Sequence, residues 1–405
     1  MMKDMNCQTS TKEILNRWAE KIYPSRKEFE KVLLKKKLLI YHGVDPTASH
    51  LHLGHSTNYL LLREFQKLGH KIILLVGDFT AQIGDPTGRI SARKPLTKKE
   101  ILRNCRTYKK QAGKILDFFG SKNPAEMKFN SKWLSKLKGE EILSLTSHST
   151  VSQMLRRNMF QNRLKKNEEI YLHEFLYPLF QGYDSVVLNC DVEVGGTDQT
   201  FNMLIGRDLL KDYKNKEKFV VTTPLLINPK TKKKLMSKSE GNFIALDDKI
   251  NNMYGKVMAL PDEVIIPCLK LCTRITLKEI TKIKEKLSLG LINPKEAKKR
   301  LAKAIIIIYY GEEEAKKAER EFERIFKEKK LPFQIKKVEI KEKFLNILEF
   351  LVKTKMVFSK SEAKRLIKQK GLKIDGKVEN NWKKILKIKK GMIIQVGKRK
   401  FIKVK

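Results

Sequence analysis

The sequence predicts an α/β protein in which a parallel-sheet domain precedes a helical region and a small α+β domain. Apolar residues 38–41 and 71–76 indicate two buried strands, and residues 53–68 between them have a helical period that ends at Gly69. A strand, helix and strand of these lengths form a parallel crossover, which is right-handed in nearly all proteins. Beyond residue 247 the pattern is helical, and residues 341–405 carry strand and turn signals again.

Positive charge dominates the composition. The chain has 86 Lys and Arg against 45 Asp and Glu, a net charge of +41. This excess favours a polyanionic partner whose binding depends strongly on salt. Solvated helix faces in a lysine-rich protein would give the same excess, so charge alone does not identify the partner. The hydrophobic content of 41% excludes a disordered polymer.

Cysteine usage and hydropathy bear on location and metals. The cysteines are scattered without the spacing of a disulfide framework, which favours a reducing, cytoplasmic location. Cys268 and Cys272 are four residues apart, but two ligands do not make a zinc site, so buried thiols are the simpler interpretation. The N-terminus lacks an apolar signal core, and the longest apolar run, 304–310, is far below the roughly 20 residues of a membrane span. We expect no protein-bound metal and no membrane association.

Two histidines stand three residues apart where the first strand leads into the helix. His52 and His55 lie in the segment YHGVDPTASHLHLGH, residues 41–55. A helix N-terminus at the carboxyl end of a parallel strand attracts phosphate groups through its N–H groups and dipole. At this spacing both rings share one helix face and could reach the same phosphates. For a lone histidine, core filling would be the simpler explanation.

A lysine-rich loop follows the strand-like segment 219–223. Residues 232–242 read KKKLMSKSEGN, and their amines and hydroxyls suit a mobile clamp on a triphosphate. The tripeptide Ser359-Lys360-Ser361 recurs in what we expect to be an ordinary capped helix. The position of the loop relative to the histidines therefore carries this prediction.

In that order, HLGH and MSKS resemble the nucleotide-binding signatures of class I aminoacyl-tRNA synthetases. Three further segments resemble tyrosyl-tRNA synthetases of the bacterial and organellar type: GDFTAQIGDPTGR at 77–89, LHEFLYPLFQGYD at 172–184 and GGTDQ at 195–199. The five motifs span residues 41–242 in family order. The resemblance implies a Rossmann-like parallel-sheet catalytic domain, an all-helical anticodon-binding domain and a small α+β RNA-binding tail domain.

Pattern and resemblance together give the expected domains. They are a helical arm (1–34, capped at Thr9, Ser10 or Thr11), a catalytic domain (35–228), a mobile KMSKS-like loop (229–246), a helical anticodon-binding domain (247–330, with one helix over 297–326), a linker (328–337) and a basic RNA-binding domain (341–405). An insertion near 123–169 makes the homodimer contact in the family. Its apolar residues Val151, Met154, Leu155 and Phe160 have a helical spacing that suits either a partner face or an internal core.

The resemblance implies a pocket for L-tyrosine. The matching residues are Tyr41, Thr80, Asp85, Tyr177, Gln181, Asp184 and Gln199. Asp184 and Tyr41 match the pair that brackets the substrate phenol, and a phenylalanine side chain would leave both unpaired. Asp85, Tyr177 and Gln181 match the acceptors of the α-ammonium group. Core packing is an alternative role for Tyr177, and the more probable one for the neighbouring Phe180.

The resemblance also implies an ATP site, with Mg²⁺ arriving on the nucleotide. The matching residues are Gly43, Asp45, His52, Gly54, His55, Gly196, Asp198 and Lys238. Of these, His52, His55 and Lys238, together with Ser237, would meet the charge that grows on pyrophosphate. Leu235 stands where the family has its first loop lysine, so we expect Lys234 to supply that charge. The pair Gly195-Gly196 could equally be a bare turn.

The tail has local signals of its own. Ser359 and Glu362 form a candidate capping box for a helix over 363–369 that Gly371 could end, and Asp375-Gly376 indicates a hairpin turn. The tail resembles the small RNA-binding domain that bacterial tyrosyl-tRNA synthetases share with a small-subunit ribosomal protein. Its helix would carry a phosphate-tracking stripe of Lys360, Lys364, Arg365 and Lys368.

Three functions stay open at this point. The first is a tyrosine–tRNA ligase that acts on L-tyrosine, ATP and tRNA(Tyr). The second is a tryptophan enzyme of the same class, against which Asp184, Tyr41 and the tail argue. The third is a non-catalytic RNA-binding protein on a synthetase scaffold, which predicts erosion of His52, His55 and Lys238, yet all three are present.

Overall fold

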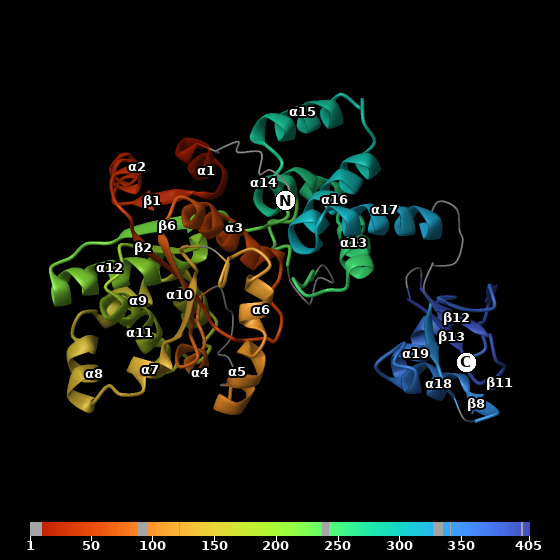
Figure 1. Cartoon of the computed structure of the whole chain (residues 1–405). Helices are drawn as coiled ribbons and strands as arrows, with labels where there is room; N and C mark the ends of the chain where they lie inside the picture. Colours follow the sequence, from red (N-terminus) through yellow and green to blue (C-terminus); the bar gives the residue numbers. More distant parts are fainter. Residues whose placement is uncertain are drawn as a thin grey trace. The chain divides into compact units, whose positions relative to one another are not determined.

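The structure is a computed structural model, shown in Figure 1, that describes residues 10–87, 96–120, 122–236, 243–326, 335–340, 342–397 and 400–405. It divides into two compact units. The first comprises residues 1–248 and 260–309, and the second comprises residues 249–259 and 310–405.

A six-stranded sheet in the order β1-β6-β5-β2-β3-β4 forms the centre of the first unit. Its strands are β1 (Lys21–Tyr23), β2 (Leu39–Val44), β3 (Lys71–Val76), β4 (Glu126–Phe129), β5 (Val192–Gly196) and β6 (Phe219–Thr223). All neighbours pair in parallel except β1, which runs antiparallel to β6. β2 pairs with both β3 and β5, so the strand order reverses its direction at β2.

The helices of the first unit follow the order that the strand and helix patterns predict. They are α1 (Thr11–Trp18), α2 (Arg26–Lys35), α3 (Leu53–Lys67), α4 (Thr80–Ile83), α5 (Lys98–Cys105), α6 (Tyr108–Ala112), α7 (Ser131–Leu134), α8 (Gly139–Thr146), α9 (Val151–Leu155), α10 (Asn158–Lys165), α11 (Leu172–Leu188), α12 (Thr200–Lys214), α14 (Ile265–Cys272), α15 (Leu277–Ser288) and α16 (Pro294–Tyr310). The predicted crossover of β2, α3 and β3 is confirmed, and α3 is followed by Gly69 at a φ of 87°.

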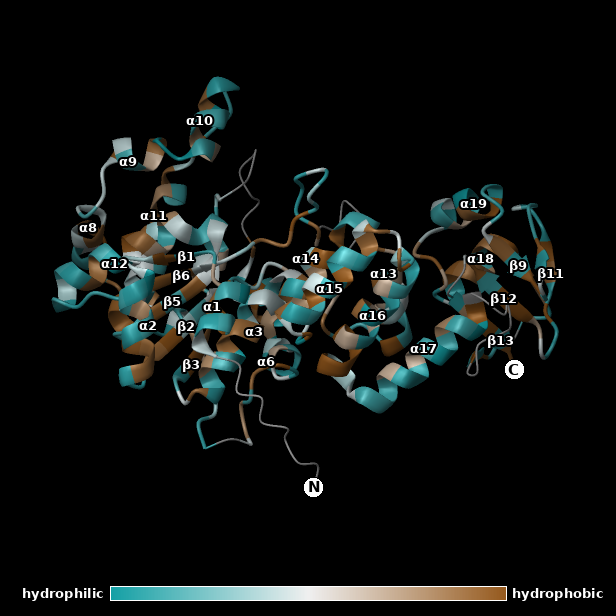
Figure 2. Ribbon diagram, turned by 90° about the horizontal axis from the view of Figure 1, so that it is seen from above, coloured by the Kyte–Doolittle hydropathy of each residue, from teal (hydrophilic) through white to brown (hydrophobic). Residues whose placement is uncertain are grey.

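Side chains of β2 alternate between two helical layers. His42 packs against Tyr59 of α3, with ring centroids 5.7 Å apart. Tyr41 packs on the other face, with Leu188 of α11 and Leu210 of α12. Because both faces are covered, the strands carry long apolar stretches, coloured brown in Figure 2, and β3 is buried and apolar from Ile72 to Val76. β2 runs three residues beyond the predicted Tyr41, since Gly43 and Val44 continue the pairing with β3.

The N-terminal helix is tied to a distant part of the same unit. Ser10 caps α1, as one of the predicted alternatives, by accepting a hydrogen bond from the Glu13 N–H. The buried Arg17 guanidinium donates to the carbonyls of Leu269, Lys270, Thr273 and Ile275, at the C-terminus of α14. A cation is favourable there because the last carbonyls of a helix carry partial negative charge. Burial lowers the pKa of Arg17 to about 10, so it stays charged at neutral pH.

The 123–169 region has two parts. Residues 126–129 form β4, the edge strand of the sheet beside β3. The following helices pack Met154 into a core with Leu134, Leu179 and Leu209, and Phe160 is fully buried against Phe175. Val151, in contrast, is 64% exposed. The helical spacing of these apolar residues therefore reflects mainly an internal core.

The second unit contains two helices and the tail. In α13 (Ile250–Met258) and α17 (Glu312–Phe326), the rings of Tyr254 and Phe322 lie 5.3 Å apart. The tail comprises β7 (Lys336–Val338), β8 (Phe344–Asn346), α18 (Ile347–Lys353), α19 (Lys360–Lys368), β9 (Leu372–Ile374), β10 (Lys377–Val378), β11 (Ile385–Lys387), β12 (Ile393–Val396) and β13 (Lys400–Val404). Its strands form a five-stranded sheet and a separate pair, and residues such as Phe350, Ile367 and Ile394 make its own core.

Several local predictions beyond residue 247 need correction. Gly311, at a φ of 88°, ends α16, so the helix expected over 297–326 is two helices. The last linker residues, Lys336 and Lys337, pair in parallel with β13 and are therefore strand. Ser359 caps α19, but the Glu362 side chain accepts from the Phe358 N–H instead of completing the capping box. Lys370, at a φ of 56°, takes the left-handed position expected of Gly371.

Other predictions are confirmed. The hairpin between β9 and β10 turns at Asp375 and Gly376, both with positive φ. Cys268 and Cys272 are buried free thiols. Within the described ranges, no helix combines the length and the apolar composition that crossing a membrane requires.

His70, just before β3, is expected to make stability depend on pH. Its Nδ1 accepts from the Leu38 N–H at 3.2 Å, and burial, assisted by Lys37, lowers its pKa to about 4. Since an unfolded histidine has a pKa of about 6.5, stability is full above that pH and falls as pH drops toward 4, by at most about 1.4 kcal/mol per pH unit. In urea unfolding at a series of pH values, His70→Gln should show a shallower decline. Identical slopes in the two proteins would contradict this assignment.

Candidate functional site

A cavity of about 450 Å³ lies in the first unit at the carboxyl ends of β2 and β5, where the strand order reverses. Ligands of open α/β sheets bind at such switch points. Most of the predicted site residues line it: Gly43, Asp45, His52, Gly54, His55, Thr80, Asp85, Tyr177, Gln181, Asp184, Gly196, Asp198, Gln199 and Lys234. Ser237 and Lys238 lie outside the described residues.

His52 and His55 cap the helix that begins at the cavity. The His52 Nδ1 accepts from the Gly54 N–H, and the His55 Nδ1 accepts from the His52 N–H, each at 3.1 Å. This is the reciprocal pattern of a capping box, made here by two imidazoles whose centroids are 3.9 Å apart. Because each Nδ1 is an acceptor, the ring proton of each neutral imidazole sits on Nε2. Each histidine can then offer one Nε2–H to a ligand.

Burial keeps His55 neutral. Desolvation, followed by the neighbouring His52 and His42, lowers the pKa of His55 well below its usual value. His55 therefore acts as a hydrogen-bond donor rather than as a cation. Gly54 lets the backbone pass close to His52, since a Cβ at residue 54 would lie 3.0 Å from the His52 ring.

Asp45 joins two walls of the cavity. One carboxylate oxygen accepts from the Tyr177 hydroxyl at 2.9 Å, and the other accepts from the Thr80 hydroxyl at 2.8 Å. A Cβ on residue 77 would lie 2.1 Å from this carboxylate, so only a glycine lets the backbone pass this close to Asp45.

A chain of amides and carboxylates forms one side of the cavity. Gln199 donates to Asp85 at 2.6 Å, and the Asn202 amide donates to the carbonyl oxygens of both Gln199 and Gln181 at 3.1 Å. The Gln181 amide nitrogen donates in turn to Glu193 at 3.2 Å. Each amide has its orientation fixed by these partners, and the side presents oxygen atoms, which suit a cationic group.

Asp184 is a buried carboxyl group with two fixed donors. Trp133 donates to one oxygen at 2.8 Å, and Asn130 donates to the other at 3.2 Å. Burial raises the pKa of Asp184 well above its usual value, and these two hydrogen bonds oppose the rise. The group is therefore an oriented acceptor in an apolar setting.

Lys234 faces the cavity while its neighbour faces the core. The Lys234 ammonium lies 2.6 Å from the Asp198 carboxylate, and its side chain is 58% exposed. Leu235 is only 2% exposed, and its N–H donates to the Leu226 carbonyl. The two residues alternate because this segment is extended, with Lys234 bridged to Ile227.

Comparison with known proteins agrees with this geometry. Residues 34–327 match the family model described as tRNA synthetases class I (W and Y). The chain belongs to this family. It is 42% identical to the tyrosine–tRNA ligase of Moorella thermoacetica, over 91% of this chain and 88% of the relative. It is also 42% identical to that of Thermotoga maritima, over 97% and 96% of the two chains.

Solved structures share the fold of this class I synthetase. A C-terminally truncated mitochondrial tyrosyl-tRNA synthetase of Aspergillus nidulans superposes with a TM-score of 0.65 and 24% identity, over 77% of this chain and 93% of that chain. The tyrosyl-tRNA synthetase of Archaeoglobus fulgidus, complexed with L-tyrosine, gives a TM-score of 0.58 at 21% identity, over 76% and 98%. At these identities the likeness extends to the fold only.

Tyr41 is the predicted residue that the synthetase fold keeps away from the cavity. It is 1% exposed, its hydroxyl pairs with the Ser185 hydroxyl at 2.7 Å, and it is absent from the cavity lining. The reason is its position three residues before the end of β2, where Ile73 and Leu210 cover it. Asp184, the other member of the pair expected to bracket the substrate phenol, does line the cavity, and its hydrogen-bond donors are Trp133 and Asn130.

Sequence reasoning missed Asn130 and Trp133. Both follow β4, and their relevance could have been found by placing β4 in the parallel sheet, because carboxyl ends of parallel strands meet at one edge. It also missed Glu193, which lines the cavity from β5. His42 also lines the cavity, and its Nδ1 lies 2.8 Å from the Val194 carbonyl.

The basic residues of the predicted phosphate-tracking stripe, Lys360, Lys364, Arg365 and Lys368, all lie on α19 in the second unit. Arg365 and Lys368 are exposed, whereas Lys360 pairs with Glu349 at 2.6 Å and Lys364 lies 4.0 Å above the Trp382 ring. Among the residues that the structure places, no group of three or more potential metal ligands occurs.

Lys218→Met is expected to destabilise this synthetase strongly. Lys218 and Glu193 form an ion pair whose side chains are 0% and 3% exposed, and Lys218 also donates to Ser185 at 2.6 Å. Loss of the lysine leaves a buried carboxylate unpaired, which costs about 3–5 kcal/mol in the free energy of unfolding. Chemical denaturation should show that loss, and Glu193→Gln in the same chain should recover part of it.

Lys216 offers a matched control. It pairs with Asp191 at 3.1 Å, but its side chain is 30% exposed. Lys216→Met should therefore cost less than about 1 kcal/mol. Equal losses in the Lys216 and Lys218 variants would contradict the importance of burial.

Proposed function

We propose that this synthetase activates L-tyrosine with ATP and then transfers tyrosine to the 3′-terminal adenosine of tRNA(Tyr). The names and coverage of the Moorella and Thermotoga relatives support this assignment. The observation that carries it within the chain is Asp184, a buried acceptor held by Trp133 and Asn130. A phenol can donate a further hydrogen bond to it, whereas a phenylalanine side chain cannot.

The amino acid would lie between two groups of side chains. Its phenol would donate to Asp184, and its ammonium group would face the oxygens of Asp85, Tyr177 and Gln181, with Gln199 beside them. The hydrogen-bonded chain from Gln199 to Glu193 supports this assignment, because it fixes the amide oxygens as acceptors.

ATP would place its phosphates at the N-terminus of α3. The Nε2–H groups of His52 and His55 would donate to phosphate oxygens, and the loop of Ser237 and Lys238 would close over them. The ribose would lie near Gly196 and Asp198. Mg²⁺ would enter with the nucleotide, as is usual for polyphosphate substrates.

The reaction requires no covalent bond to the protein. A tyrosine carboxylate oxygen attacks the α-phosphorus, the bond to the bridging oxygen breaks, and pyrophosphate leaves. A ribose hydroxyl of the tRNA then attacks the carbonyl carbon, and AMP departs. Positioning of the reactants and stabilisation of charge on the leaving pyrophosphate account for catalysis.

We further propose that the tail binds RNA through α19 and that two chains form a homodimer through the 123–169 region. Exposed Arg365 and Lys368 support an RNA surface that tracks phosphates. Exposed apolar side chains at Leu143 and Val151, which are 73% and 64% exposed, support a partner face alongside the internal core.

Amino-acid-dependent exchange of pyrophosphate into ATP, without tRNA, tests the assignment. The purified chain is assayed in parallel with tyrosine, phenylalanine and tryptophan. Exchange with tyrosine alone is expected. Exchange with tryptophan would favour the other branch of the family, and exchange with none of the three would favour a protein that only binds RNA.

His55→Glu separates the two roles of that histidine. Glutamate at this helix position can still accept from the His52 N–H, as in a capping box, but it has no N–H to donate. We expect adenylate formation to fall roughly 100-fold or more in both His55→Glu and His55→Ala, as for loss of one donor to a developing charge. Wild-type rates in His55→Glu with a loss only in His55→Ala would reduce the role of His55 to capping.

Lys234→Ala should slow adenylate formation several-fold and leave tyrosine affinity unchanged. Lys234 lines the cavity beside Asp198, and a triphosphate would compete with that carboxylate for the ammonium group. The neighbouring Lys233, which is outside the cavity lining, provides the control Lys233→Ala. Equal activation kinetics in the wild type and the Lys234 variant, measured by stopped-flow fluorescence, would remove Lys234 from the site.

A further inference from the structure

A nearly continuous helical segment runs beside the loop that leads to the two histidines. It comprises α5, a turn at residues 106–107 and α6. Asn104, Tyr108 and Gln111 are spaced by four and three residues, so they share one face of this segment. Lys114 follows three residues later, in the turn after α6. Gln111 is 1% exposed and Tyr108 is 2% exposed.

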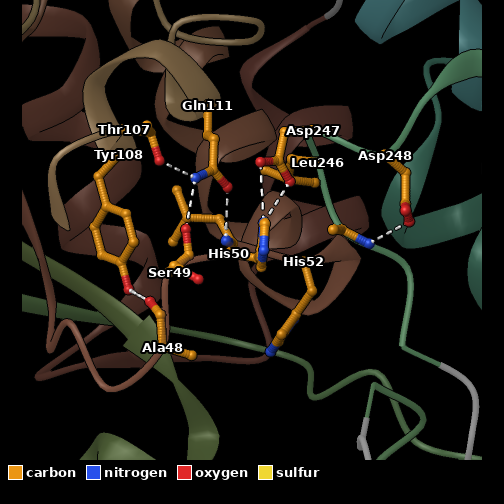
Figure 3. Close-up of polar contacts among 12 residues, drawn as sticks. Ala48, Ser49, His50, His52, Thr107, Tyr108, Gln111, Leu246, Asp247 and Asp248 are labelled. Atoms are coloured by element: carbon orange, nitrogen blue, oxygen red, sulfur yellow. Dashed lines mark hydrogen bonds and ion pairs between the residues drawn. The ribbon is translucent and has the colours of Figure 1, made fainter. Parts of the chain in front are cut away.

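The first three of these side chains hold the backbone of the loop. Asn104 donates to the Pro46 carbonyl at 2.9 Å and Tyr108 donates to the Ala48 carbonyl at 2.6 Å. Gln111 donates to the Ser49 carbonyl at 2.9 Å and accepts from the Leu51 N–H at 2.7 Å. Figure 3 shows Tyr108 and Gln111 directed at Ala48 and Ser49, with Gln111 also bonded to Thr107.

Lys114 holds the second segment, the chain that returns from the lysine loop. It donates to the Leu246 carbonyl at 2.8 Å. That segment pairs with the histidine segment, because the Leu53 N–H donates to the Ile244 carbonyl and the Leu246 N–H donates to the Leu51 carbonyl. His50 and Asp247 meet on the outside of this pairing at 2.9 Å, as seen in Figure 3.

The loop itself has no regular hydrogen bonding that would set its path. Residues 45–51 contain bends and no helix or strand, so several of their backbone groups, among them the carbonyls of Pro46, Ala48 and Ser49, bond to side chains instead. Gln111 satisfies both a carbonyl and an N–H within three residues of His52. Any shift of the Gln111 amide therefore moves the start of α3 and the imidazoles that cap it.

We propose that four side chains, those of Asn104, Tyr108, Gln111 and Lys114, are positioning residues. They align the histidine segment with the base of the lysine loop for the attack of the tyrosine carboxylate on the α-phosphorus. They touch no reacting atom and act through the backbone of residues 46–51 and 246. Gln111 is the central member because it bonds Ser49 and Leu51, and the carbonyl of Leu51 accepts from the Leu246 N–H of the second segment. This inference rests on the proposed function, since the step it serves is adenylate formation.

A graded set of variants tests the proposal. Gln111→Met keeps the side-chain volume and removes its hydrogen bonds, Tyr108→Phe removes one, and Arg106→Ala changes an exposed residue of the same segment as a control. Adenylate formation should fall roughly 10- to 100-fold in Gln111→Met, less in Tyr108→Phe and not in Arg106→Ala, because small misplacements of catalytic groups have effects of this size. The equilibrium constant for tyrosine binding should stay within about twofold, since that pocket lies on other elements.

A second readout does not depend on activity. Amide hydrogen exchange in Gln111→Met should increase in peptides covering residues 46–53 and 244–248 together, and not in the peptide covering 192–199. Wild-type adenylate formation in Gln111→Met would overturn the proposal, as would a loss of tyrosine binding in proportion to the loss of rate, which would indicate general unfolding. If the wild-type chain itself shows no exchange with tyrosine, the proposed function fails, whereas the hydrogen-exchange result still tests the alignment.

Discussion

The parallel pairing of β2 with both β3 and β5 is the constraint on which the rest of the first unit depends. Because the strand order reverses at β2, the carboxyl ends of two neighbouring strands open toward the same space and leave a cavity between them. α3 begins at the end of one of these strands, and Gly196 and Asp198 follow the other. Residues from separate motifs, such as His52, Asp85 and Gln199, converge because the sheet brings the ends of their strands together.

The sequence alone predicts the structure correctly where local pattern determines it. The limits of α3, the left-handed Gly69 and the strand β3 follow from periodicity and backbone preference, and every predicted pocket residue in the described ranges except Tyr41 lines the cavity. It does not predict the position of a side chain where packing between distant segments determines that position. Tyr41 is buried because Leu210, far along the chain, covers it, and Trp133 reaches Asp184 only once β4 has joined the sheet. Gly311 shows a third case, in which one residue with positive φ divides a helix that periodicity predicts as continuous.

The cavity combines neutral donors with fixed acceptors. Burial and reciprocal capping make His55 an uncharged N–H donor, and the same hydrogen bonding assigns the ring proton of a neutral His52 to Nε2. The walls carry Asp45, Asp85 and Asp198, so the permanent charge of the cavity is largely negative. Lys234 of the lysine segment brings positive charge to this cavity. Leu235 is buried and Lys234 is not, and this alternation explains how the segment can present an ammonium group one residue earlier than the usual motif.

Arg17 has a consequence for the order in which the chain can fold during synthesis. Its guanidinium binds the Ile275 carbonyl, 258 residues later, and Trp18 binds the Leu271 carbonyl from the same helix. At 5–20 residues per second, a ribosome needs roughly 13–52 s to make the intervening chain. For that interval the apolar face of α1, with Ile14, Leu15 and Trp18, has no α14 to pack against. α1 can pack against α3 as soon as that helix has been made, whereas the hydrogen bonds of Arg17 and Trp18 to the end of α14 form only after residue 275 has left the ribosome.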